Sequence, residues 1–145
     1  VTLVKQQARL FALDKGYNLV LVDGPPGIGC PVISAVSGAD LTLIVTEPTA
    51  SGVHDMRRVL ETTEHFSVPA LVCINKADLY PQGTSDIIDF CKKMNIPVVG
   101  KIPFDTIVTK AMVQGQPVTA FNKSLVADEI KRTWEHVQTH LEAVE

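Results

Sequence analysis

The stretch Leu19-Val20-Leu21-Val22-Asp23-Gly24-Pro25-Pro26-Gly27-Ile28-Gly29-Cys30-Pro31 decides how this chain of 145 residues folds. Its first four residues are all apolar, which is typical of a strand in a parallel sheet with helices on both faces. The run ends in Asp23, and a turn stiffened by two prolines follows at once. The stretch therefore predicts a buried strand over residues 18–23 that presents a carboxylate at its carboxyl end.

Three further apolar runs alternate with amphipathic segments of helical length, which is the pattern of βαβ units. We expect strands over residues 18–23, 41–46, 70–75 and 98–102. We expect helices over residues 3–15, 31–37, 51–64, 84–94, 107–113 and 124–141. Ser51 is expected to cap the third helix, and residues 81–84 to form a loop that leads into the fourth. The predicted fold is α/β, a three-layer parallel sheet flanked by helices, with residues 1–145 forming a single domain.

The composition excludes several classes of function. With 46% hydrophobic and 20% charged residues, the chain is rich enough in apolar side chains to bury a core. Its lysines and arginines are scattered and the net charge is −3, so we expect no nucleic-acid partner. No apolar run approaches the roughly 20 residues that span a bilayer, and no secretory signal is seen. We therefore expect a cytoplasmic protein without a transmembrane segment.

The three cysteines are too far apart for a C-x-x-C pair. Cys73 is expected in the core and Cys91 on a helix face toward the sheet, whereas Cys30 lies in the turn, where packing is favoured over a nucleophilic role. His136 and His140 have the i, i+4 spacing of metal ligands, but no glutamate accompanies them. We expect both to be solvated surface residues.

Polar side chains follow each predicted strand, at residues 23–27, 46–49, 75–78 and 103–105. In open parallel sheets, ligands bind beyond the carboxyl ends of the strands. The Asp23 carboxylate can hold a Mg²⁺-bound water, because Mg²⁺ keeps most of its hydration shell. Gly27 leaves a bare N–H that can approach a terminal phosphate. The alternative is a strand end closed by a proline turn.

The segment Asn75-Lys76-Ala77-Asp78 matches the pattern N-K-x-D. In this pattern the amide and the carboxylate bind the edge of a purine, and the lysine stem packs on the ring. The alternative is that Asn75 caps the turn and Lys76 is solvated.

Four segments at successive strand ends closely resemble the MinD/ParA/Mrp-like P-loop ATPases. In chain order they are residues 22–33, 38–49, 72–76 and 100–105. The closest likeness is to MinD-like ATPases that carry an inserted ferredoxin domain. The resemblance implies an ATP and Mg²⁺ site in which Asp23 is the Walker-B carboxylate, Gly24 binds the nucleotide and the switch turn runs through Gly27. It also implies adenine recognition near Asn75 and the Pro103-Phe104-Asp105 loop. The implied partners are ATP or ADP, a second copy in a homodimer, and an iron–sulfur or electron-transfer protein.

The chain departs from this family pattern in two ways. It contains no G-x-x-x-x-G-K-[ST] phosphate loop and no cysteine run for a [4Fe–4S] cluster. In the family both lie upstream of the position of Val1, so we interpret residues 1–145 as the C-terminal part of a MinD-like ATPase domain. The isolated chain is then expected to hydrolyse ATP poorly or not at all. The family's P-loop strand lies between the strands that end at Asp23 and Thr46, so we expect a gapped, rearranged or domain-swapped sheet.

Two other classes of function stay open at this point. A receiver-like domain would use Asp23 as the phosphoacceptor, with Thr46 and Lys76 or Lys101 as switch residues. That pattern needs a further acidic pair for Mg²⁺, and only Asp14, within a predicted helix, precedes Asp23. The other alternative is a non-catalytic scaffold that keeps the sheet for protein partners.

Overall fold

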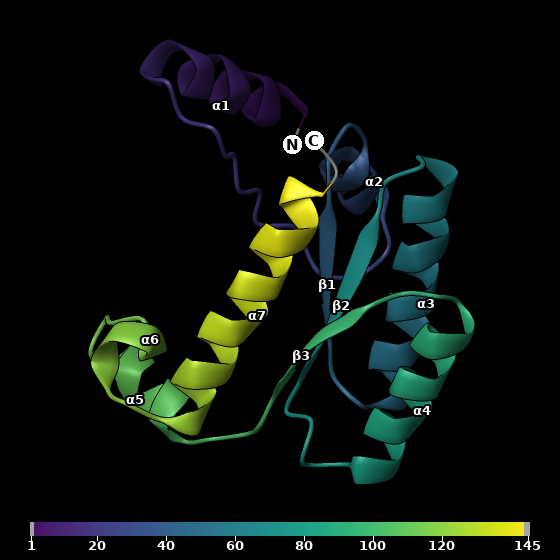
Figure 1. The fold of residues 1–145 in the computed structure, drawn as a ribbon, viewed down its shortest axis with the longest axis vertical. Helices are drawn as coiled ribbons and strands as arrows, with labels where there is room; N and C mark the ends of the chain where they lie inside the picture. The colour runs from purple at the N-terminus through teal and green to yellow at the C-terminus, as the bar shows by residue number, and fades with distance from the viewer. Residues whose placement is uncertain (1, 144–145) are drawn as a thin grey trace.

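The structure is a computed structural model that describes residues 2–143 (Figure 1). In chain order its elements are α1 (Thr2–Lys15), α2 (Cys30–Val36), β1 (Thr42–Thr46), α3 (Ala50–His65), β2 (Ala70–Asn75), α4 (Pro81–Lys93), β3 (Val98–Ile102), α5 (Ile107–Val113), α6 (Val118–Phe121) and α7 (Leu125–Glu142). Three of the four predicted strands and all six predicted helices are present within a few residues of their expected bounds.

The sheet has three parallel strands in the order β1-β2-β3. Thr42 of β1 pairs with Ala70 of β2, and the register continues without a break to Thr46 and Ile74. Figure 1 shows α3 and α4 against one face of the sheet and α7 across the other. The predicted α/β architecture with three layers is therefore confirmed.

The side chains of β2 alternate between the two faces, as the period of a strand requires. Val72 and Ile74 face α3 and α4, and they pack in one cluster with Met56, Leu60, Ile87 and Cys91. Leu71 belongs to the opposite face, in a cluster with Val99 and Val137. Both faces of β2 are thus buried, and the prediction that Cys73 and Cys91 lie in the core is confirmed.

Helix α7 lies close against β3 because Gly100 carries no side chain. A Cβ atom built at Gly100 would overlap the Thr133 hydroxyl of α7. Nearby, the β2–β3 register shifts between Val72 and Cys73, and the His136 ring nitrogen Nδ1 donates to the Val99 carbonyl at 2.9 Å. The helix is therefore fixed to β3 both by close packing and by a side-chain hydrogen bond.

The predicted strand over residues 18–23 is wrong, because this segment forms no strand in the structure. Its apolar side chains are exposed, and Leu21 is 79% accessible. A strand needs a neighbour that accepts and donates its backbone hydrogen bonds, and this segment has no such neighbour among residues 2–143. The sheet accordingly stops at β1 and is continuous from β1 to β3, so the expected gap between two strands is not formed.

Two helix boundaries differ from the expected ones, and one short helix was not expected. The cap of α3 is Thr49, whose hydroxyl accepts the Gly52 N–H at 3.1 Å, and Ser51 lies inside the first turn. Helix α4 already begins at Pro81, since the fixed φ of proline suits the first helical position. The short helix α6, which follows Pro117, was not predicted because four residues are too few to show a helical period.

Helix α1 stands apart from the sheet and is joined to it by an extended segment (Figure 1). The Lys5 ammonium donates to the Ala35 carbonyl at 2.8 Å and to the Ser37 carbonyl at 2.7 Å. These carbonyls belong to the last turn of α2, where a cation is favoured by the helix dipole. Burial lowers the pKa of Lys5, and the nearby Asp40 carboxylate opposes that shift.

Candidate functional site

The turn after β2 prolongs the pairing of β2 with β3 beyond the strand ends. The Asn75 side-chain oxygen accepts the Lys76 N–H at 3.0 Å. Lys76 has a φ of 53°, in the left-handed region, which turns the chain sharply at this point. The Ala77 N–H then donates to the Ile102 carbonyl at 3.0 Å. The N-K-x-D segment is therefore held directly against the end of β3.

Two carboxylates organise the loop after β3. Asp78 Oδ1 accepts the Phe104 N–H at 2.7 Å, and Asp105 Oδ1 accepts the Ile107 N–H at 2.8 Å. The first bond joins the turn after β2 to the loop after β3. The second supports the start of α5. The structure thus brings together all six residues predicted for base recognition: Asn75, Lys76, Asp78, Pro103, Phe104 and Asp105.

Lys76 does not extend freely into solvent. Its ammonium lies 2.7 Å from Glu47 Oε1, at the carboxyl end of β1, and both side chains are partly exposed. An exposed pair of this kind contributes about 0–1 kcal/mol to stability, so its main effect is on the position of the lysine. Glu47 was not predicted as a site residue, although it is among the polar residues that directly follow the predicted strand over residues 41–46.

A groove of about 1030 Å³ runs along the free edge of β1. Its walls are the apolar segment that includes Leu19 and Leu21, the outward side chains Leu43 and Val45 of β1, and Trp134 of α7. The groove separates the predicted first strand from the sheet that it was expected to join. It is mainly apolar along its length, and acidic groups line part of it.

The three residues predicted for the magnesium and phosphate side, Asp23, Gly24 and Gly27, line this groove. Gly27 has a φ of 86°, and no atom lies within 4 Å of where its Cβ would be. Its backbone is therefore open to a close approach, as the glycine's predicted role requires. The groove lining does not include Asn75, Lys76 or Asp78, so the two halves of the predicted site lie apart. Glu47 connects them, since it lines the groove and pairs with Lys76.

The cysteines and histidines do not form a metal centre. Among residues 2–143 no group of three or more His, Cys, Asp or Glu side chains is placed to hold a metal ion. Burial raises the pKa of the Cys73 thiol to about 11, partly offset by the neighbouring Thr133 hydroxyl, and burial also raises the pKa of Cys91. Neither thiol is suited to form the thiolate that an iron–sulfur cluster binds. His136 is exposed and His140 is partly exposed, as predicted for surface residues, and each also donates through Nδ1 to a backbone carbonyl.

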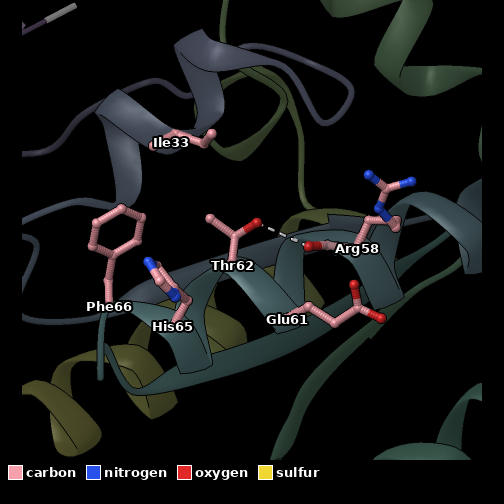
Figure 2. A pocket seen from close by; sticks show the side chains of 6 residues that line it. All are labelled: Ile33, Arg58, Glu61, Thr62, His65 and Phe66. Atoms are coloured by element: carbon pink, nitrogen blue, oxygen red, sulfur yellow. Dashed lines mark hydrogen bonds between the residues drawn. The ribbon is translucent and has the colours of Figure 1, made fainter.

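A second, smaller hollow of about 420 Å³ lies between α2 and the second half of α3. Figure 2 shows Ile33 of α2 across from Thr62, with His65 and Phe66 beside them. The Thr62 hydroxyl donates to the Arg58 carbonyl of its own helix at 3.0 Å. None of the predicted site residues lines this hollow, so it is separate from the site.

A parallel sheet with helices on both faces, and with polar residues gathered at the carboxyl ends of its strands, defines an open α/β protein whose ligands bind at that edge of the sheet. The family model of the NUBPL iron-transfer P-loop NTPases, within the ParA group, matches residues 13–140. The chain belongs to this family. In addition, no helix of residues 2–143 combines the length and the apolar character needed to cross a membrane.

Known proteins of this group are similar to the chain over most of its length. An uncharacterized protein of Methanocaldococcus jannaschii is 34% identical over 137 residues, which cover 93% of this chain and 44% of that protein. The septum site-determining protein MinD of Bacillus subtilis is 35% identical over 112 residues, or 73% of this chain and 41% of that protein. The chain therefore spans less than half the length of these relatives.

Solved structures of MinD share the fold. The MinD cell division protein of Aquifex aeolicus matches with a TM-score of 0.77 and 26% identity, over 92% of this chain and 58% of that one. MinD of Pyrococcus horikoshii, solved in complex with Mg-ADP, matches with a TM-score of 0.73 and 20% identity, over 94% of this chain and 56% of that one. The likeness confirms the predicted relationship to the MinD/ParA-like ATPases.

Proposed function

We propose that this chain is the C-terminal part of a MinD-like ATPase domain, and that it supplies the magnesium side and the base side of an ATP site. The groove along β1 is the observation that carries the proposal. It lies between the apolar segment of residues 19–22 and the unpaired edge of β1. One added strand would pair with both neighbours and make residues 18–23 a strand as well.

The added strand would also complete the site. If the added strand ran parallel to β1, it would end beside Asp23 and Glu47. The phosphate loop that follows it would then face the polar edge of the sheet. The chain spans 44% of its Methanocaldococcus relative and 58% of the Aquifex MinD chain, which supports a larger whole protein. We expect that protein to form a nucleotide-dependent homodimer in the cytoplasm.

The residues of this chain then have separate roles. Asp23 would orient water bound to Mg²⁺, and Gly27 would present its N–H to the terminal phosphate. Asn75, Lys76 and the loop of residues 103–105 would hold adenine. Bound Mg-ATP supplies the phosphoryl group and the charge neutralisation for its transfer. The Pyrococcus MinD structure that shares this fold was solved with Mg-ADP, which is consistent with the proposed nucleotide ligand.

A role of the whole protein in iron–sulfur work is supported by the description of its family as iron-transfer NTPases. The three cysteines of this chain do not fit a cluster, because Cys73 and Cys91 are buried, Cys30 is exposed, and no group of three possible ligands occurs among residues 2–143. Any cluster would lie in a part of the protein outside these residues, such as an inserted ferredoxin domain. An iron–sulfur or electron-transfer partner, or a protein that is positioned by the ATPase, would be the client.

The receiver alternative has less support. Lys76 pairs with Glu47 and not with Asp23, and Asp14 lies on α1, with its carboxylate 3.3 Å from Lys15 Nζ. Among residues 2–143, Asp23 belongs to no group of three His, Cys, Asp or Glu side chains placed to hold a metal ion, so the acidic set that a receiver requires is not formed.

Complementation with a peptide tests the proposal. The peptide would carry an apolar strand followed by a G-K-G-G-x-G-K-T loop, and a peptide of the same composition in scrambled order would be the control. We expect the chain alone to show no ATP turnover, and the chain with the peptide to bind Mg-ATP in a manner abolished by Asp23→Ala. Turnover by the chain alone that Asp23→Ala abolishes would contradict the proposal, as would equal binding with the scrambled peptide.

A matched pair of variants tests the groove itself. Val45 lines the groove and Leu125 does not, yet they are 60% and 61% exposed. Val45→Lys places a charge at the β1 edge and should prevent peptide binding. Leu125→Lys should leave it unchanged. Equal effects of the two lysines would show that the peptide binds elsewhere.

A further inference from the structure

We propose that Glu47 is a positioning residue that changes partner: it holds Lys76 in the isolated chain, and it exchanges Lys76 for a cation of the strand that completes the sheet. This inference rests on the proposed function, and it adds a coupling between the two halves of the site. One side chain carries that coupling, because Glu47 lines the groove along β1 and also contacts the turn after β2.

The main chain is fixed on both sides of this ion pair. On the β1 side, the Thr46 hydroxyl donates to the Gly52 carbonyl at 2.9 Å, and a Cβ atom at Gly52 would overlap the Glu47 carbonyl. On the β2 side, the Lys76 N–H donates to the Asn75 side chain at 3.0 Å. The carboxylate and the ammonium, 2.7 Å apart, therefore meet through their side-chain rotamers alone. An exchange of partner needs no movement of the backbone.

The ion pair is also weak enough to be exchanged. The side chains of Lys76 and Glu47 are 38% and 40% exposed, so water screens their attraction. A pair of this kind changes an equilibrium by no more than about fivefold. A second cation near Glu47 can therefore replace Lys76 at little cost in free energy.

The charges in the groove favour such a cation. Among the described residues that line the groove, the charged ones are Asp23, Glu47 and Asp55, and the lining contains no lysine, arginine or histidine. The rest of the lining is mainly apolar and suits a strand. A strand that brings a positive charge to the carboxyl end of β1 would be attracted by these carboxylates.

The exchange would carry information from the groove to the turn after β2. Once Glu47 pairs with the incoming cation, the Lys76 ammonium loses the contact that holds it beside β1. It is then able to move toward a bound nucleotide, which carries the opposite charge. The strand and the nucleotide should therefore bind with positive coupling, limited by the strength of one exposed ion pair to about fivefold.

Removal of Lys76 tests the exchange, because Lys76 does not line the groove and yet competes for Glu47. The probe is the peptide with the G-K-G-G-x-G-K-T loop, titrated calorimetrically into the 145-residue chain, beside the same peptide with glutamine in place of both lysines. Lys76→Gln should tighten binding of the lysine peptide about two- to fivefold and leave the glutamine peptide unchanged. Lys93→Gln, exposed in the last turn of α4, removes the same charge and is the control.

The variant Glu47→Gln completes a double-mutant cycle. In this background, Lys76→Gln should affect the lysine peptide no more than Lys93→Gln does. An equal gain from Lys76→Gln in both backgrounds would show general charge attraction and overturn the exchange, as would no gain in the wild-type background. Either result would leave the proposed function intact, whereas absence of binding by both peptides would overturn the function and the exchange together.

The ion pair itself is tested by NMR on the chain without a peptide. Glu47→Gln should shift the Cε–Hε resonances of Lys76, because the carboxylate that holds the ammonium is lost. Glu61→Gln, exposed on α3, should leave them in place. Unchanged Lys76 resonances in Glu47→Gln would overturn the positioning role of Glu47.

Discussion

Gly100 of β3 lies directly beneath Thr133 of α7, and replacing the glycine by alanine measures how tightly this helix is packed. The added Cβ would overlap Thr133 Oγ1 and would lie 3.0 Å from both Thr133 Cβ and Cγ2. Thr133 is only 5% exposed. Its hydroxyl donates to the Glu129 carbonyl at 2.8 Å, so the side chain cannot rotate away without losing that bond.

Overpacking of this kind costs about 1–3 kcal/mol of unfolding free energy. We expect Gly100→Ala to fall in that range, measured by urea unfolding followed by circular dichroism, with a midpoint of thermal unfolding lower by about 2–4 °C for each kcal/mol. Thr133→Ala removes two of the three crowded atoms, and in the double variant it should recover at least about 0.5 kcal/mol. Thr133→Val keeps the same volume and should recover nothing.

Two outcomes would refute this reasoning. One is a loss below about 0.5 kcal/mol in Gly100→Ala, which is the range of ordinary surface substitutions. The other is equal recovery by Thr133→Val and Thr133→Ala, which would mean that volume at position 133 is not the cause. Gly24→Ala is the control, since a Cβ at Gly24 would meet no atom within 4 Å.

Three further predictions concern the helix cap, the accessibility of the thiols and the pH dependence of stability. Thr49→Ala should cost about 1 kcal/mol in urea unfolding because it removes the cap of α3, whereas Ser51→Ala should change stability by no more than a few tenths. A maleimide should label Cys30 in the folded chain and leave Cys73 and Cys91 unlabelled until it unfolds. Folding raises the pKa of the Cys73 thiol from 9.0 to about 11, so the unfolded state loses this proton at a lower pH than the folded state does. The free energy of unfolding should therefore fall as the pH rises from 9 to about 11. The fall should be less steep in Cys73→Ala. A steeper fall in the variant would show the opposite sign.

The parts of the fold that depend on local pattern could be predicted from the sequence. Strand β2 and helix α7 were placed within a residue of their bounds, because the apolar run from Ala70 and the stripe through Trp134 and Val137 each carry their period within the segment itself. Residues 18–23 have an equally strong apolar run. Whether that run becomes a strand depends on a hydrogen-bonding partner elsewhere, which local pattern does not contain.

In the candidate site, too, the sequence predicted which residues lie together but not the contacts between them. The order of polar residues after the strands correctly grouped Asn75 and Asp78 with the loop of Phe104. It did not predict that the Asp78 carboxylate binds the Phe104 backbone, or that Glu47 pairs with Lys76. These contacts depend on the register between β1, β2 and β3 and on the rotamers at their ends. A motif of four residues determines neither the register of the strands nor the rotamers at their ends.

The unpaired edge of β1 also affects how the chain behaves in concentrated solution. The strand Thr42–Thr46 contains no lysine and no proline, and its pairing with β2 has no bulge, so it lacks the features that keep sheet edges from joining one another. Its open N–H and C=O groups, next to exposed leucine and valine side chains, form a template on which other polypeptides can stack as cross-β aggregates. Folding yield should therefore depend on how quickly this edge is covered during synthesis, and a solubilising charge at Val45 should improve recovery of the isolated chain.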